Sequence, residues 1–155
     1  MSDASQHTAK EFLRRRLIDF QKRIADLSFA LASLQNDHQQ WEKEFYLELF
    51  EVLDSFENIF QSIEEIEPQW DKSARAAMQS FRSIYRKILR MLSQRGIEQI
   101  EFPDQRAVFG LCRVVETKTV PGMENEHILS VLRKGYRKKN GEILRPAEVI
   151  TVLNG

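Results

Sequence analysis

The feature that most constrains this chain is an apolar repeat that runs from Leu13 to Ile66. Its members are separated by alternating steps of four and three residues, the spacing that predicts one face of a long α-helix in a coiled coil. They are Leu13, Leu17, Phe20, Ile24, Leu27, Leu31, Leu34, Trp41 and Phe45, followed by Leu49, Val52, Phe56, Ile59, Ile63 and Ile66. Between about Ala9 and Glu67 no proline or glycine interrupts the helix. An apolar seam of this length needs a partner helix, either from a second copy of the chain or from later in the sequence.

A helical hairpin is predicted where this first helix ends. The apolar stripe widens from Leu47 onward, as expected for a helix that packs against several neighbours. Pro68 then ends the helix, and a second apolar periodicity predicts another helix that stops at Gly96. Because one hairpin supplies only half of the apolar partners that a four-helix bundle needs, we expect a homodimer. The residues expected at the dimer interface are Leu27, Leu31, Leu34, Trp41, Phe45, Leu49, Val52, Phe56, Phe81, Ile84 and Ile88.

Short segments rich in β-branched residues replace the helical periodicity after Gly96. They cover residues 97–102, 107–117, 128–134 and 143–153 and predict strands, with Pro121-Gly122 and Asn140-Gly141 as the predicted turns. We therefore expect an α+β fold: a long N-terminal coiled-coil helix, a helical hairpin forming a dimeric four-helix bundle, and a small C-terminal all-β domain. The expected boundaries are 1–8 for a disordered lead-in, 9–46 for the coiled-coil helix, 47–96 for the hairpin and 97–155 for the β domain.

Motifs for catalysis and metal binding are missing from the sequence. It holds no glycine-rich phosphate loop, no Gly-x-Ser-x-Gly turn and no His-Glu-x-x-His, and His7, His38 and His127 lie in unrelated settings. Cys112 is the single cysteine, which excludes an intrachain disulfide and a cysteine-cluster metal site. With apolar neighbours and no adjacent histidine, Cys112 is expected to fill the interior and not to act as a nucleophile. We expect no enzyme activity, no cofactor and no metal.

The charge balance limits the partners that this chain can have. Lys plus Arg and Asp plus Glu both number 23, and this neutrality disfavours a protein that coats nucleic acid or an anionic membrane. The N-terminus has no apolar signal core, and no segment approaches 18 uncharged apolar residues. We expect a soluble, cytoplasmic protein without a membrane-bound part.

Three polar features leave alternatives open. His38 occupies a seam position, where it can fix the helix register or act as a metal ligand or pH sensor. The run 14–16 is either a solvated face or an anion site. A basic cluster near the C-terminus can contact phosphates or an acidic partner, or can protect a sheet edge from aggregation. It contains Arg133, Lys134, Arg137, Lys138, Lys139 and Arg145.

Several short motifs of this sequence are similar to those of a known protein family. The tail contains Lys134-Gly135-Tyr136, then Asn140-Gly141, then Leu144-Arg145-Pro146-Ala147, and Val52-Leu53-Asp54-Ser55-Phe56-Glu57 opens the predicted hairpin. Gly96-Ile97-Glu98 follows the second helix, and Val115-Glu116 with Pro121-Gly122 looks like a central β hairpin. In order and spacing over about residues 47 to 152, these motifs resemble the GrpE-type nucleotide exchange factors of DnaK-type chaperones.

The resemblance implies a homodimer whose β domain binds the ATPase domain of a DnaK-type chaperone and opens the nucleotide cleft, so that ADP leaves. By position it implies that Pro121, Gly122, Leu132, Glu142, Arg145 and Thr151 contact the chaperone. Gly135, Tyr136, Pro146 and Ala147 are expected to hold the β domain in shape, and Arg145 can serve either purpose. The alternatives are a GrpE-like adaptor that has lost exchange activity and, less favoured by the neutral charge, a nucleic-acid binder.

This sequence also departs from the family pattern. The Asp-Pro-x-x-His stretch that enters the family's β domain is missing, and Phe109 stands where its histidine would fall. Glu142 replaces a basic residue, and the valine usual near the end is either replaced by Thr151 or shifted to Val152. These differences indicate a divergent member with a modified chaperone-binding surface.

Overall fold

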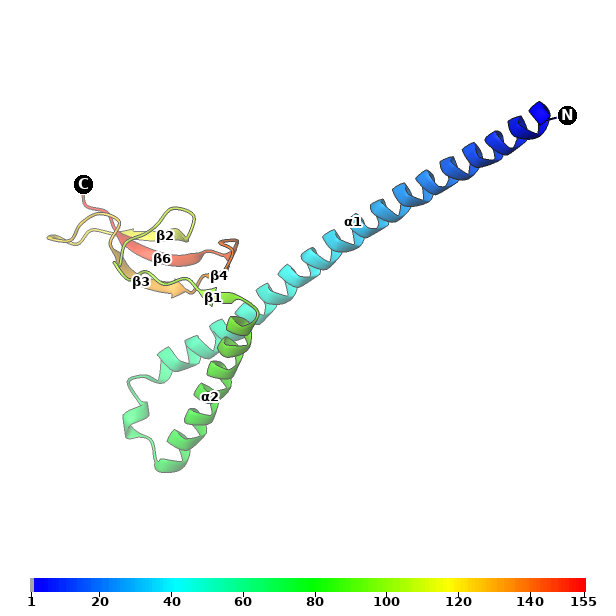
Figure 1. Ribbon diagram of the computed structural model, residues 1–155. Coiled ribbons are helices and arrows are strands. Elements are labelled where there is room, and N and C mark those ends of the chain that lie inside the picture. Colours follow the sequence, from blue (N-terminus) through cyan, green and yellow to red (C-terminus); the bar gives the residue numbers. More distant parts are fainter. Residues whose placement is uncertain (1) are drawn as a thin grey trace. The chain divides into compact units, whose positions relative to one another are not determined.

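The computed structural model describes the backbone of residues 2–155 and the side chains from residue 7 onward (Figure 1). Helix α1 spans Ser2–Ile63 and is followed by the 3-10 helix η1 at Glu67–Gln69 and helix α2 at Lys72–Gln94. α1 begins ahead of the Ala9 start that the sequence suggested and includes most of the polar lead-in, of which Met1 lies outside the described residues. Within residues 2–155, no helix has both the length and the apolar character needed to cross a membrane.

The chain divides into two compact units, Met1–Glu44 and Phe45–Gly155. The described side chains of the first unit are almost all exposed, including the seam residues Leu27 and Leu34 at 70% and 67%. His38 contacts Trp41 edge to face, with ring centroids 6.3 Å apart. Within residues 7–44, the seam side chains of this unit are therefore largely open to solvent.

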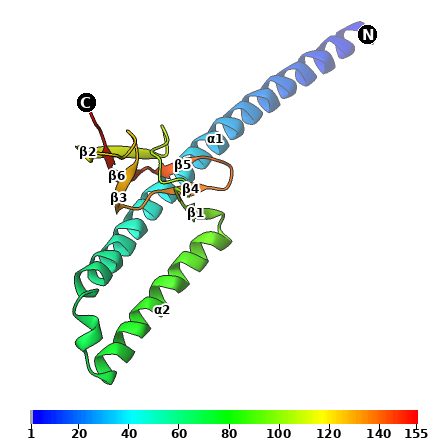
Figure 2. The same cartoon turned by 90° about the vertical axis from the view of Figure 1, so that its left-hand side faces the viewer.

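The second unit begins with the helical hairpin that the sequence predicted (Figure 2). Asp71 caps α2 by accepting a hydrogen bond from the backbone N–H of Ala74 at 2.7 Å. Gly96, at φ +76°, follows the last turn of α2, in the backbone region that glycine adopts without strain. Large aromatic side chains fill the space between the two helices, with Phe56 6.5 Å from Phe81 between ring centroids. The end of α2 before Gly96 is as the sequence indicated, whereas α1 ends at Ile63, ahead of the predicted stop at Pro68, which lies in η1.

Two three-stranded sheets form the β unit, residues 97–155. The first has the order β1-β4-β5 and is antiparallel, with β1 at Ile97–Gln99, β4 at Tyr136–Lys138 and β5 at Ile143–Arg145. The second has the order β2-β6-β3, with β2 at Cys112–Lys118, β6 at Ala147–Val152 and β3 at Ile128–Arg133. β6 is central and pairs in parallel with β2 and antiparallel with β3.

Three strand predictions need correction. β2 and β3 do not form a hairpin around Pro121-Gly122, because β6 lies between them. The single strand expected over 143–153 is two strands, β5 and β6, which separate at Pro146 and enter different sheets. β4 was not predicted, since it is three residues long and lies inside the basic run. The α+β fold with a small all-β region is confirmed.

Two apolar clusters hold this unit together. The larger one joins both helices to the first sheet and contains Tyr46, Phe50, Leu53, Leu92, Ile97, Tyr136 and Leu144. The smaller one lies on the second sheet and contains Ile128, Ala147 and Val149, with Phe102, Ala107 and Cys112 packed against it. Cys112 thus fills part of an apolar cluster, as the sequence predicted.

Candidate partner-binding surface

Asp54 of α1 is the centre of a polar contact between the helix and the β unit. Arg145 donates to both carboxylate oxygens of Asp54, from Nη1 at 2.8 Å and from Nη2 at 2.6 Å. Arg133, at the end of β3, donates from Nε to Oδ2 at 2.6 Å, and this hydrogen bond raises the pKa of Arg133. One carboxylate therefore accepts three charge-assisted hydrogen bonds from two arginines, the strong class of such bonds.

Arg145 is enclosed on its other sides as well. Its guanidinium lies 5.4 Å from the ring centroids of both Phe50 and Tyr136, which stack at 3.9 Å with an interplanar angle of 6°. The carbonyl of Lys134 accepts from Nε at 3.2 Å and from Nη2 at 2.8 Å. Arg145 is 8% exposed. Two roles were considered for Arg145, contact with a chaperone and support of the β unit. Its burial and its internal hydrogen bonds favour the second role.

A second polar group lies beside the first, between α1, α2 and β1. The hydroxyl of Tyr85 donates to Glu57, and Lys134 Nζ lies 3.0 Å from Glu57 Oε1. Gln99 Nε2 donates to the hydroxyls of Tyr85 and Tyr136, each at 3.2 Å. Burial raises the pKa of Tyr136 to about 12, and burial together with the bond to Glu57 raises the pKa of Tyr85. Both phenols thus stay protonated near neutral pH and act as hydrogen-bonding groups between elements.

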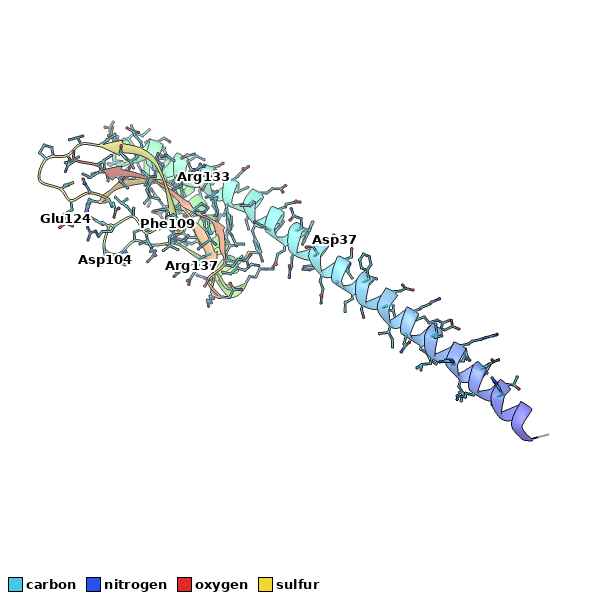
Figure 3. All side chains as sticks on the ribbon, turned by 90° about the horizontal axis from the view of Figure 1, so that it is seen from above. Asp37, Asp104, Phe109, Glu124, Arg133 and Arg137 are labelled. Atoms are coloured by element: carbon cyan, nitrogen blue, oxygen red, sulfur yellow. The ribbon has the colours of Figure 1, made fainter. Side chains whose placement is uncertain are left out.

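Most members of the basic cluster pair with carboxylates of the same chain. Two of them, Arg133 and Arg137, are labelled in Figure 3. Besides the contacts above, Arg137 lies 3.0 Å from Glu98 and Lys138 lies 3.1 Å from Glu142. The paired members are Arg133, Lys134, Arg137, Lys138 and Arg145. Their charge is therefore compensated within the chain, and most of the cluster holds elements together.

Pro121 and Gly122 lie in an exposed turn between β2 and β3. The carbonyl of Val120 accepts from the N–H of Met123 at 3.2 Å, and Gly122 has φ +84°, as in a type II turn. The side chain of Asn154 fixes the turn, since it accepts from the N–H of Val120 at 3.0 Å and donates to the carbonyl of Met123 at 2.7 Å. The turn is thus ordered and accessible.

The other expected contact residues do not share one surface. Leu132 is 53% exposed and lies at an irregularity of β3, near the end of that strand. Glu142 is exposed in the turn between β4 and β5, where it pairs with Lys138. Thr151, expected to face a partner, is 3% exposed and lies on β6, the strand between β2 and β3. In this structure Thr151 is an interior residue, and its side chain does not reach the surface.

Comparison with known proteins decides the family. The GrpE family model matches residues 9–152. The chain belongs to the GrpE family. It is 32% identical over 103 residues to protein GrpE of Alkaliphilus oremlandii, covering 66% of this chain and 51% of the relative. It is 26% identical over 110 residues to protein GrpE of Colwellia psychrerythraea, covering 70% and 52%. The chain thus spans about half the length of these curated relatives.

Two of the GrpE-like motifs contact each other. Asp54 comes from the Val52–Glu57 motif of α1, and Arg145 comes from the Leu144–Ala147 motif of the tail. Their ion pair connects residues 91 positions apart in sequence. The sequence motifs that carry the GrpE resemblance therefore include the contact that attaches the β unit to the helix.

Sequence reasoning missed the exposure of Phe109 in this GrpE chain. Phe109 is fully exposed, at 103%, on a turn in which Val108 accepts from the N–H of Leu111 at 3.1 Å and Gly110 has φ +85°. The adjacent Val108 is 48% exposed. The sequence marked this position because Phe109 stands where the family has a histidine. The sequence around a single apolar residue does not show whether its side chain is exposed.

The residues expected at the GrpE dimer interface lie on an accessible face of the helices. Tyr46, Phe50 and Leu53 of α1 point into the larger apolar cluster. The other expected residues of the second unit are partly or fully exposed: Phe45, Leu49, Val52, Phe56, Phe81, Ile84 and Ile88. Leu49 and Ile88 also pack against the larger cluster, and Phe56 contacts Phe81 between the helices. The apolar stripe that widens after Leu47 therefore supplies the internal cluster and also leaves apolar side chains partly exposed.

One cleft of about 490 Å³ lies between the end of α2 and the first sheet. Two carboxylates line it, Glu98, which is paired with Arg137, and Glu101. Among the residues that the structure describes, no group of three or more His, Cys, Asp and Glu side chains could hold a metal ion. The exposed turns and exposed apolar side chains are features that suit binding of another protein.

Proposed function

We propose that this protein is a nucleotide exchange factor that binds the ATPase domain of a DnaK-type chaperone and promotes the release of ADP. The observation that carries the proposal is the GrpE family match, which extends over the long helix, the hairpin and the β unit. A binding protein needs no catalytic side chain for this role. If it prefers the chaperone with an open nucleotide cleft, linkage requires that it weakens the affinity of the chaperone for nucleotide by the same factor.

Three exposed features of the β unit are proposed to contact the chaperone. They are the Pro121-Gly122 turn, Leu132 and Glu142. Leu132 supplies an apolar side chain at a position that a partner can cover, and Glu142 supplies a negative charge where the family commonly has a positive one. A partner complementary to this surface carries an apolar contact and a basic group at the matching positions.

The role is tested by following the release of labelled ADP from a DnaK-type chaperone of the same source by stopped flow. We expect the release rate to rise with the concentration of this protein and to reach a plateau. The same chaperone without the protein gives the intrinsic rate. If none of the DnaK-type chaperones of that cell releases ADP faster, the proposal is wrong.

The working molecule is proposed to be a homodimer joined along α1 and through the hairpins. The support is the exposed seam of the first unit together with the open apolar face of the second. The proposed division is 9–46 for the coiled-coil helix, 47–96 for the bundle hairpin and 97–155 for the chaperone-binding β unit. Sedimentation equilibrium in dilute buffer gives the mass, and a single-chain mass at micromolar concentration would contradict the dimer.

A second candidate is an adaptor that keeps the GrpE fold without exchange activity. The observation in its favour is the altered surface, in which Glu142 pairs with Lys138 and Thr151 is internal. An adaptor would bind a protein other than the chaperone and leave ADP release unchanged. Affinity capture that returns a stable non-chaperone partner, together with flat release kinetics, would favour it.

A further inference from the structure

Three kinds of contact attach the β unit to the helical hairpin. The chain itself connects them at Gly96, where α2 ends and β1 begins. Apolar side chains connect them in the larger cluster, most closely where Phe50 stacks on Tyr136. Hydrogen bonds connect them at Asp54, Arg133 and Arg145, a set that we name the Asp54 joint.

These contacts differ in what they can fix. Burial of apolar surface is non-directional, so the cluster holds the β unit against α1 without setting one angle between them. A bidentate arginine–carboxylate pair is planar and directional, since two parallel N–H groups must meet two oxygens. The pair between Arg145 and Asp54 has this form, with bonds of 2.8 Å and 2.6 Å.

Further contacts define the position of the guanidinium plane. The two rings lie at 5.4 Å from it, and the carbonyl of Lys134 accepts two of its N–H groups. Arg133 adds a bond to Asp54 from the end of β3, a strand of the other sheet. Asp54 thus receives hydrogen bonds from both sheets, and the rotation of either sheet about α1 would break at least one of them.

We propose that Asp54 is a positioning residue that fixes the orientation of the β unit on α1, so that chaperone binding energy is used to open the nucleotide cleft. The second half of this statement rests on the proposed exchange function. A β unit that rotates freely on α1 can still bind the chaperone. It then reorients to fit the chaperone with a closed nucleotide cleft, and the cleft is not opened. Loss of the joint then lowers the maximal rate of ADP release more than it lowers the apparent affinity.

Orientation is tested directly by measuring a distance between two spin labels. Cysteines replace the exposed residues Glu48 on α1 and Lys118 on β2, in a Cys112→Ala background, and labelled chains are diluted into an excess of unlabelled chains. We expect a narrow distance distribution for the otherwise unchanged protein and a clearly broader one for Asp54→Asn. The matched control is Glu51→Gln on the same helix, which removes an exposed contact to Arg133 at 3.8 Å and should leave the distribution narrow.

The functional readout separates maximal rate from affinity. For Asp54→Asn we expect the plateau rate of ADP release to fall by about fivefold or more, the lower end of typical coupling between sites, while the half-saturating concentration changes little. A mainly structural role would instead lower the amount of folded protein and leave the plateau per folded molecule unchanged. Far-UV circular dichroism gives the folded fraction for this normalisation.

Arg133→Gln provides a second variant in case Asp54→Asn does not fold. It removes one of the three bonds at a half-exposed residue and leaves the bidentate pair intact, so we expect a smaller broadening. A narrow distribution in every folded joint variant would overturn the proposal. The distance measurement needs no chaperone, and failure of the exchange function in the unmodified protein is therefore distinguishable from failure of the joint.

Discussion

At Gly135 the fold depends on the absence of a side chain. A Cβ atom there would lie 2.5 Å from the backbone N of Ala147 and 3.0 Å from the carbonyl oxygen of Arg145. Both atoms belong to the backbone, so neither can move as a flexible side chain would. The chain passes this point just before β4, beside the place where β5 ends and β6 begins.

The first prediction follows from this close approach. Gly135→Ala should lower the free energy of unfolding by about 2–3 kcal/mol, the upper part of the range for inserting a methyl group into a packed interior. Urea titration monitored by circular dichroism measures it. Gly155→Ala is the control, because a Cβ at Gly155 meets no atom within 4 Å. Equal stability of the two variants would contradict the close approach.

The second prediction concerns Leu132, whose side chain is 53% exposed. Leu132→Ala should weaken chaperone binding by about 1–2 kcal/mol, as expected for truncation of an apolar contact residue, with little change in melting temperature. Leu153→Ala is a matched control, since Leu153 is 55% exposed but is not among the expected contacts. Isothermal titration calorimetry gives both affinities, and equal affinities would remove Leu132 from the binding surface.

At the scale of elements, the turn between α1 and α2 is held by an ion pair. Arg82 of α2 donates two hydrogen bonds to Glu67 of η1, from Nη1 at 2.5 Å and from Nη2, and lies over the ring of Phe60 at 5.6 Å. The hydrogen bonds from Arg82 lower the pKa of Glu67, although burial acts in the opposite direction. The pair thus joins α2 to the turn that precedes it.

The third prediction is the pH dependence of this pair. Because Glu67 has a lower pKa in the folded state than in the unfolded chain, its stabilising contribution is present above the unfolded pKa. It is lost as the pH falls through the folded value. Glu67→Gln should therefore reduce the drop in melting temperature between pH 6 and pH 3. Glu64→Gln, at an exposed neighbouring position, is the control, and identical pH profiles for Glu67→Gln and the unmodified protein would exclude the effect.

The fourth prediction concerns the exposed seam of α1. A lysine at a seam position places a charge where the dimer interface is proposed, whereas a lysine on the opposite face stays in solvent. Leu34→Lys should therefore raise the dimer dissociation constant by tenfold or more, about 1.4 kcal/mol. Asn36→Lys adds the same side chain two residues away and should leave it unchanged. Sedimentation at several concentrations measures both.

Secondary-structure elements could be predicted from the sequence where the spacing of apolar residues within the element specifies them. The alternating steps of α1 and the stop at Gly96 give the helices because each depends on neighbours a few residues apart, whereas α1 ends at Ile63, ahead of the predicted stop at Pro68. β4 could not be found this way, since Tyr136–Lys138 is short and its partners β1 and β5 define it as a strand. The parallel pairing of β2 with β6 likewise depends on residues about 35 positions apart, such as Cys112 and Ala147.

The candidate site was predictable to a smaller extent. The motif resemblance placed Pro121-Gly122, Leu132 and Glu142, which the structure shows to be exposed. It also placed Thr151, which is 3% exposed on β6, and the position of β6 between β2 and β3 is a property of sheet order that local sequence does not contain. The basic cluster looked like a surface feature because its carboxylate partners, Asp54 and Glu57, lie far away in the sequence.

At the scale of the whole molecule, the two compact units differ in what stabilises them. Both apolar clusters belong to residues 45–155. Residues 1–44 have no buried apolar core of their own among the described side chains. We therefore expect residues 1–44 of the long helix to need a partner helix, whereas the hairpin and β unit have an interior within one chain.

The last prediction tests this difference with a chain that lacks residues 1–44. The near-UV circular dichroism of the stacked Phe50 and Tyr136 should be retained, since every member of their cluster lies in the remaining chain. The far-UV helical signal should fall by about the share of helix removed, and the melting temperature of the remaining core should change by only a few degrees. The control is a deletion of residues 97–155, which removes Tyr136 and Leu144 and should abolish the near-UV signal. If the shortened chain of residues 45–155 lost its near-UV signal, the hairpin and β unit would need the long helix in order to fold, and the two units would have to be regarded as one cooperative structure.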